Sequence, residues 1–88
     1  MYIVYILYSL KDYKLYVGCT SNLEQRLKRH NFGYVYSTAN RRPLVLIYHE
    51  RFINKAEAFN RERFLKSLWS VRLKKKLLRE YLLGRAKS

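Results

Sequence analysis

VYILYSLKDYKLYVG, residues 4–18, is the stretch of this chain that decides the fold. Its two ends, Val4 to Ser9 and Lys14 to Gly18, are rich in aliphatic, β-branched and tyrosine side chains, which are typical of strands. Lys11-Asp12-Tyr13 lies between them as a short turn segment. Two such strands joined by a turn predict a β-hairpin.

The segment that follows the hairpin carries start and stop signals of a helix. Ser21 is a good N-cap residue, and Glu24 three positions later completes a capping box. We expect the helix to run from Asn22 to about Asn31, because Gly33 just beyond it is a typical stop.

The second half of the chain predicts one more strand and two more helices. Residues 33–43 form a loop that ends at a proline, and Leu44 to His49 is a strand rich in Val, Ile and Tyr. Asn54 is expected to cap a helix that runs to about Leu68. Ser70 is expected to cap the last helix, which Gly84 closes.

Together these segments predict an α/β fold with the element order β-β-α-β-α-α. We expect a single compact domain over residues 1–84, in which a three-stranded sheet is flanked by helices. Residues 85–88 are expected to be a frayed basic tail. Hydrophobic residues make up 49% of the 88-residue chain, enough for a small core without disulfides.

The formal net charge of +13 makes a polyanion the natural partner. We expect DNA, with RNA as the alternative, and neither a membrane nor a small-molecule cofactor. No apolar stretch approaches the roughly 20 residues that span a bilayer, and no basic segment precedes the first apolar run as in a secretory signal. The single cysteine, Cys19, cannot form an internal bridge, which favours the reducing cytoplasm.

Two helices place polar side chains where apolar ones would be expected. Arg26 and His30 border the buried stripe of the first helix, one turn apart. Glu62 falls on the same face of the second helix as Ala58, Leu65 and Trp69. A buried carboxylate costs several kcal/mol unless it is paired or bound to a cation. A hard divalent metal is one reason for a glutamate there.

Short motifs recur at informative spacings along the chain. Ile3-Val4-Tyr5 lies in the first strand and Tyr16-Val17-Gly18 in the second, and Arg26 follows Tyr16 by ten residues. His30, Arg41-Arg42-Pro43 and Arg61-Glu62 come after them in that order. In order and spacing the chain resembles the GIY-YIG nuclease domain, in particular the small stand-alone bacterial proteins of the UPF0213 type.

This resemblance implies metal-dependent hydrolysis of DNA phosphodiesters. One motif tyrosine, Tyr5 or Tyr16, would act as general base or orient the attacking water, with His30 beside it. Arg26 would steady the scissile phosphate, and Glu62 would hold one Mg²⁺ or Mn²⁺. A guanidinium and a metal ion neutralise the charge that grows in the transition state. Without room for an added DNA-binding module, cleavage with little sequence preference is expected.

The chain also departs from the family pattern. Ile3 replaces the first motif glycine, and Cys19 stands where many catalytic relatives have a lysine. The alternative function is therefore a catalytically weak or inactive nucleic-acid-binding module of the same fold. A third class is an adaptor that docks a protein through Trp69 and the last helix.

Other basic residues are candidates for phosphate contacts. We expect nucleic-acid binding by Arg41, Arg42, Lys66, Arg72, Lys74 and Lys75. Structural explanations remain open for the site: a salt bridge for Arg26, a core-edge histidine with a backbone partner for His30, and an ion pair between Glu62 and Arg26.

Overall fold

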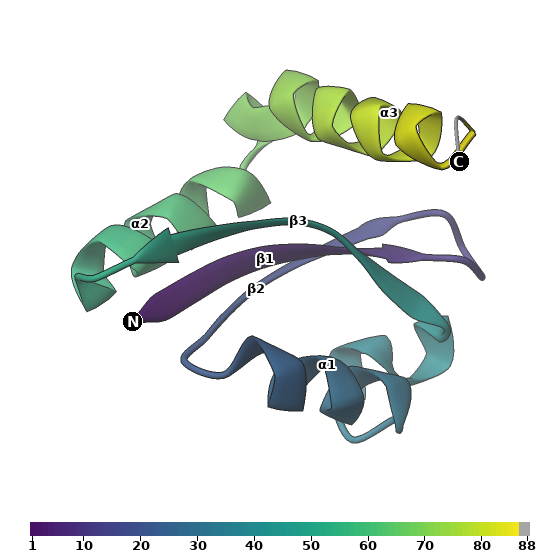
Figure 1. Ribbon diagram of the computed structural model, residues 1–88, viewed down its shortest axis with the longest axis horizontal. Helices are drawn as coiled ribbons and strands as arrows, with labels where there is room; N and C mark the ends of the chain where they lie inside the picture. The colour runs from purple at the N-terminus through teal and green to yellow at the C-terminus, as the bar shows by residue number, and fades with distance from the viewer. Residues whose placement is uncertain (87–88) are drawn as a thin grey trace.

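A three-stranded antiparallel sheet of order β2-β1-β3 is the middle layer of this computed structural model, which describes residues 1–86. Helix α1 covers one face of the sheet, and α2 and α3 cover the other (Figure 1). The elements are β1 (Tyr2–Ser9), β2 (Leu15–Thr20), α1 (Leu23–Asn31), β3 (Leu44–Phe52), α2 (Lys55–Lys66) and α3 (Val71–Ala86), with 3₁₀ turns η1 (Tyr36–Arg41) and η2 (Leu68–Ser70). The predicted α/β class and element order are confirmed.

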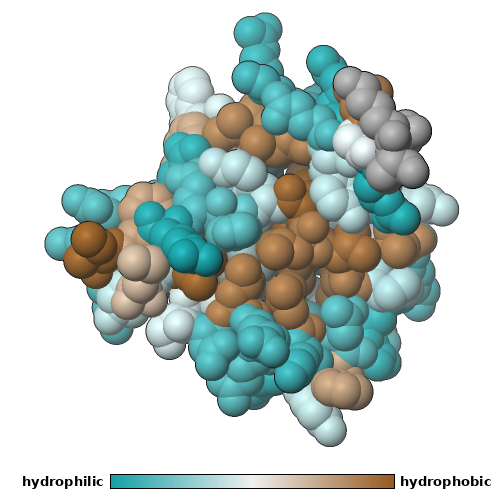
Figure 2. Space-filling view, viewed as in Figure 1, coloured by the Kyte–Doolittle hydropathy of each residue, from teal (hydrophilic) through white to brown (hydrophobic). Residues whose placement is uncertain are grey.

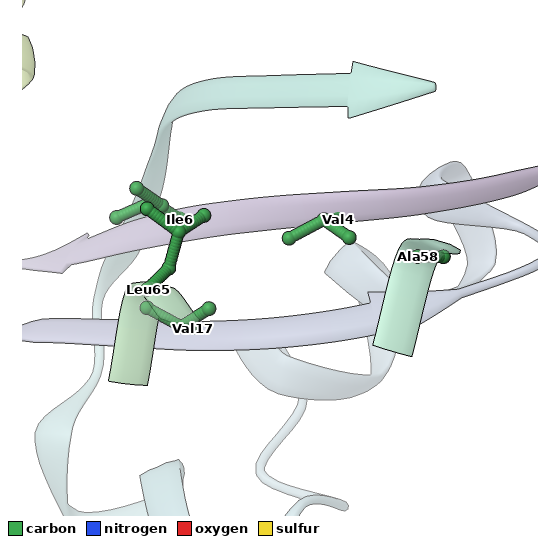
Figure 3. Close-up of a cluster of buried hydrophobic side chains, with 5 residues drawn as sticks. All are labelled: Val4, Ile6, Val17, Ala58 and Leu65. Atoms are coloured by element: carbon green, nitrogen blue, oxygen red, sulfur yellow. The ribbon is translucent and has the colours of Figure 1, made fainter. Parts of the chain in front are cut away.

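The central strand β1 is buried on both faces, and its alternation supplies two hydrophobic clusters. Val4 and Ile6 face α2, where Figure 3 shows them with Val17, Ala58 and Leu65. The intervening side chains, Tyr5 and Leu7, belong to the second cluster, against α1. Because side chains alternate between the faces of a strand, Tyr5 is directed to the α1 layer while its neighbours anchor α2.

An irregularity in β3 changes which face its side chains occupy. Ile6 of β1 pairs with Tyr48, but the next residue, Leu7, pairs with Leu46, so Ile47 is an extra residue. Such a bulge inverts the alternation beyond it. Leu46 therefore packs on the α1 side, whereas Tyr48 packs on the α2 side.

Helix α1 begins at a different cap from the one predicted. Asn22, not Ser21, is the N-cap, and its side-chain oxygen accepts a hydrogen bond from the Gln25 N–H at 3.0 Å. The helix starts one residue later than expected, so Glu24 lies outside a capping box and pairs with Lys28. At the other end Gly33 has a φ of +83°, the left-handed conformation of a helix stop. That part of the prediction is correct.

The C-terminal helices differ more from the prediction. Asn54 caps α2 as expected, but the helix ends at Lys66. Trp69 therefore leaves the buried face of α2 and is 89% exposed in η2. Ser70 does not cap α3, because its hydroxyl donates to the carbonyls of Leu65 and Ser67.

The end of α3 also differs from the prediction. The helix continues through Gly84 to Ala86, so Gly84 does not close it, and Arg85 and Ala86 of the expected tail are helical. Lys87 and Ser88 lie outside the described residues. In the part of the chain that is described, no helix is long and apolar enough to cross a membrane.

Apolar side chains also reach the surface along the last helix. Leu78, Leu82 and Leu83 line a surface hollow together with Lys75 and Arg79. Figure 2 shows brown, apolar side chains in the middle of one face of the molecule, ringed by hydrophilic ones.

Candidate active site

Three aromatic rings from three different elements meet at the α1 face of the sheet. Tyr5 comes from β1, Tyr16 from the edge strand β2, and His30 from the last turn of α1. The ring centroid of His30 lies 5.0 Å from that of Tyr16 and 5.8 Å from that of Tyr5, both with edge-on geometry. The hairpin and the first helix thus bring together residues far apart in the sequence.

Gly18 is the reason that Tyr5 can reach this position. The two residues are direct partners across β1 and β2, and the Tyr5 ring lies over the glycine. A Cβ atom at Gly18 would overlap the Tyr5 ring and hydroxyl. A glycine inside a strand commonly marks such a close approach. The motif glycine therefore has a packing role in seating the tyrosine.

His30 is fully buried and has a side-chain partner on each ring nitrogen. Its Nε2 lies 3.0 Å from the Tyr5 hydroxyl, and its Nδ1 lies 2.7 Å from the Thr38 hydroxyl. The structural explanation predicted a hydrogen bond from His30 to the backbone, but both ring nitrogens contact side chains instead. Sequence reasoning missed Thr38, because η1 was expected to be an irregular loop without a periodic pattern.

Burial is the largest influence on the pKa values of Tyr5 and His30 in this cluster. It raises the pKa of Tyr5, with Tyr16 and the Glu62 carboxylate adding to the effect and the Arg26 guanidinium opposing it. Burial, together with the Arg26 charge, lowers the pKa of His30 to about 4. Near neutral pH Tyr5 is therefore a phenol and His30 a neutral imidazole.

Arg26 lies close enough to the Tyr5 hydroxyl to affect its pKa. The side chain is half-buried at the border of the α1 stripe, as predicted. Within residues 1–86 it forms no ion pair, so neither the proposed salt bridge nor a pair with Glu62 is present. A guanidinium that is partly shielded and has no carboxylate partner is suited to a phosphate oxygen.

Glu62 is carried by α2, which covers the other face of the sheet, and its charge acts on Tyr5 from there. Its carboxylate raises the pKa of both Tyr5 and Cys19, although burial is the larger cause for each. The side chain is half-buried and pairs with Lys66 at 3.1 Å. It also lines a surface pocket of about 340 Å³. The sequence placed Glu62 correctly near a buried face, and its ion-pair partner is Lys66, not Arg26, the alternative that the sequence leaves open.

The helix that carries Glu62 is fastened to the sheet by its neighbour. Arg61 binds the Glu50 carboxylate of β3 through Nε at 3.0 Å and through a second nitrogen at 2.9 Å. The Tyr48 hydroxyl donates to the same carboxylate at 2.8 Å. This pairing sets the rotation of α2 against the sheet, and so the direction of Glu62.

The donor set at Glu62 fits a magnesium-type ion and excludes an all-protein cage. Within the described residues, no group of three or more His, Cys, Asp or Glu side chains could hold a metal. Mg²⁺ commonly keeps several waters and takes one or two carboxylates plus substrate phosphates. The pocket that Glu62 lines is completed by Phe59, Arg63 and Lys66, so a bound ion would have this single carboxylate, its own waters and substrate phosphate as ligands.

The predicted phosphate-binding residues fall into two groups. Arg41 is engaged inside the fold, because its Nε pairs with Asp12 at 2.9 Å and its terminal nitrogen donates to the Leu15 carbonyl. Lys74 is half-buried. The remaining predicted residues are exposed on the surface: Arg42, Lys66, Arg72 and Lys75.

Known proteins have sequences similar to this one. A family model described as the GIY-YIG catalytic domain matches residues 1–76, so the chain belongs to the GIY-YIG family. It is 50% identical over 66 residues to UPF0213 protein CPE1444 of Clostridium perfringens, which covers 74% of this chain and 70% of that protein. It is 44% identical over 78 residues to UPF0213 protein SH2523 of Staphylococcus haemolyticus, covering 88% and 93%. No solved structure matches it significantly.

Proposed function

We propose that this protein hydrolyses DNA phosphodiester bonds with the help of one Mg²⁺ or Mn²⁺ held by Glu62. The observation that carries the proposal is the convergence of two tyrosines, a histidine and an arginine without a carboxylate partner beside a glutamate. A purely structural cluster would gain little from an Arg26 that has no ion pair within residues 1–86 and lies near a carboxylate acting on the same tyrosine.

Each protein group has a role in this proposal. Arg26 binds a non-bridging oxygen of the scissile phosphate and neutralises charge that develops during attack. Tyr16 is half-buried, and its hydroxyl has no hydrogen-bond partner within residues 1–86, which leaves it open to the attacking water. Tyr5 and His30 act as one hydrogen-bonded unit behind it. When bound, the metal ion supplies further neutralisation of the phosphate.

Little sequence preference follows from the kind of contacts available. The exposed candidates are lysines and arginines, which bind phosphates, and phosphate contacts carry no base information. To reach a phosphate, Lys66 would leave its pair with the half-buried Glu62 carboxylate, which the exposed position of the lysine allows.

The alternative is a nucleic-acid-binding module that no longer cuts. Two observations favour it: Cys19 stands where the resemblance has a lysine, and the Glu62 carboxylate already has a lysine partner. Cys19 is half-buried against the apolar cluster on the α2 side, and burial raises the pKa of its thiol. It is therefore a packing residue and no substitute for a cation.

A cleavage assay separates the two functions. Purified protein is incubated with supercoiled plasmid, single-stranded DNA and RNA in Mg²⁺, Mn²⁺ or EDTA. We expect metal-dependent cleavage of DNA that EDTA abolishes. Binding to DNA without cleavage under any metal would instead support the binding module, and Cys19→Lys would then be tested for restored activity.

A further inference from the structure

Thr38 is a buried residue of the 3₁₀ turn η1. Its hydroxyl has two hydrogen-bond partners. Its Oγ1 lies 2.7 Å from His30 Nδ1, and the same hydroxyl donates to the Val35 carbonyl at 3.4 Å. The Thr38 side chain has no exposed surface. Because this hydroxyl is buried against an imidazole, the position of its proton determines which hydrogen bonds can form.

The hydrogen-bond chain has only one direction that uses every contact. The Val35 carbonyl can only accept, so the single hydroxyl proton of Thr38 goes to it. Thr38 Oγ1 must then accept from Nδ1–H of His30. A neutral imidazole carries one proton, so Nε2 is an acceptor and Tyr5 donates to it at 3.0 Å.

We propose that Thr38 is a positioning residue that holds His30 in the Nδ1-protonated tautomer and so keeps Nε2 open to the proton of Tyr5. The consequence for the reaction rests on the function proposed above. The Tyr5–His30 unit then takes up the proton that the attacking water releases at Tyr16, with Tyr5 passing its own proton to His30 Nε2. The hydroxide forms its bond to phosphorus while the ester P–O bond to the leaving oxygen breaks, and the leaving oxygen takes a proton from solvent water. Tyr5 ends neutral, and the imidazolium keeps both N–H bonds directed at Tyr5 and Thr38.

The opposite tautomer would stop this transfer. If Thr38 donated to Nδ1, then Nε2 would carry the proton and donate to Tyr5. His30 would have no free nitrogen facing the tyrosine, and the bond from Thr38 to Val35 would be lost. Thr38, which lies outside every motif of the family resemblance, therefore decides which way the proton can move.

The tautomer can be observed directly, without any activity. Protein labelled with ¹⁵N-histidine is measured by long-range ¹H–¹⁵N NMR at neutral pH, with the exposed His49 as the second ring in the spectrum. We expect His30 Nδ1 to be the protonated nitrogen in the parent and in Thr38→Ser. In Thr38→Val, which removes the acceptor, we expect the Nε2-protonated form or a mixture.

Matched variants connect the tautomer to catalysis. Thr38→Val should lower kcat about 10- to 100-fold, the typical cost of removing the partner that orients a functional histidine, with KM nearly unchanged. Thr38→Ser should restore most of the activity. The control is Ser37→Ala, which removes an exposed hydroxyl from the same turn and should change neither spectrum nor rate.

Two results would overturn the proposal. One is an Nε2-protonated His30 in the parent spectrum, which remains decisive even if Thr38→Val does not fold. The other is an unchanged Nδ1-protonated tautomer in a folded Thr38→Val. A parent protein that shows the expected tautomer but cuts no DNA would refute the proposed function and leave the role of Thr38 in the tautomer intact.

Discussion

At the scale of single residues, Glu62 is the sharpest test of a metal-dependent reaction. Glu62→Gln removes the carboxylate that would hold the ion, so we expect metal-dependent cleavage to be lost. DNA binding should be unchanged or tighter, because one negative charge has gone. Cleavage gels and fluorescence anisotropy measure the two effects separately.

The matched control is Glu57→Gln, which removes the same charge from an exposed position of the same helix. It should bind DNA like Glu62→Gln but cut like the parent. A Glu62→Gln protein that cuts at the parent rate would show that the ion is held elsewhere.

Tyr16 and Arg26 should matter for cleavage far more than for binding. Loss of a general base typically costs ~10²–10⁴ in rate, and Tyr16→Phe keeps the ring and its contact with His30. Arg26→Ala removes a guanidinium that forms no ion pair within residues 1–86. Single-turnover rates and dissociation constants should be measured for both.

Suitable controls lie on the same elements. Tyr13→Phe changes an exposed tyrosine of the hairpin turn, and Arg29→Ala an exposed arginine of α1. Tyr5→Phe should lose activity as well, because both tyrosines contact His30. Full activity in Tyr16→Phe would make that residue structural.

Buried His30 should make the folded state sensitive to acid. Its pKa is about 4 in the folded protein against an ordinary value of 6.5. Between these values the unfolded chain binds more protons, so this contribution to stability is complete above pH 6.5 and is lost as pH falls toward 4. The loss is at most about 3 kcal/mol.

Urea unfolding of the parent and of His30→Gln at several pH values measures this contribution. The parent should lose more stability than the variant between pH 6.5 and 4, because the variant has no imidazole to titrate there. Equal slopes for the two proteins would show that His30 is not protected from protonation.

At the scale of the elements, the start of α1 places Arg26 and His30. Asn22 caps this helix through its side chain, whereas no side-chain hydrogen bond of Ser21 is present within the described residues. We therefore expect Asn22→Ala to lower the free energy of unfolding by about 1 kcal/mol. Ser21→Ala should change it by less than about 0.5 kcal/mol, as for an ordinary surface position.

Chemical denaturation of the two variants side by side decides between the caps. The reverse order of effects would mean that Ser21 takes over the capping role in solution. Because Arg26 lies one turn from the cap, a weakened cap should also reduce the cleavage rate more than a surface substitution on α3 does.

At the scale of the whole molecule, the charge of +13 should make binding to nucleic acid strongly dependent on salt. Each neutralised phosphate contributes about −0.9 to the slope of log affinity against log salt on duplex DNA, so several contacts should give a slope of several units. Arg72→Ala should make that slope shallower by about 1. Anisotropy titrations at several salt concentrations provide the slopes.

Arg41→Gln serves as the comparison, because the Arg41 guanidinium is already paired with Asp12 inside the fold. We expect this variant to lose stability while keeping the parent slope. An affinity that does not depend on salt would exclude electrostatic recognition of the backbone.

The sequence by itself determined the local elements and the residues that could do chemistry. Strand and helix patterns depend on neighbours only a few positions away, so the hairpin, α1 and the cap at Asn54 could be predicted from residue type and spacing. The spacing of Tyr16 and Arg26 likewise led to the GIY-YIG family.

Only the tertiary structure decided how those residues are paired. The bulge at Ile47 depends on the register between β1 and β3, which no local pattern encodes. Arg61 is held by Glu50 of a distant strand, and Arg26 forms no ion pair within residues 1–86; neither outcome follows from spacing along the helices. Thr38 reaches His30 because η1 folds back over α1, a contact set by packing and not by periodicity.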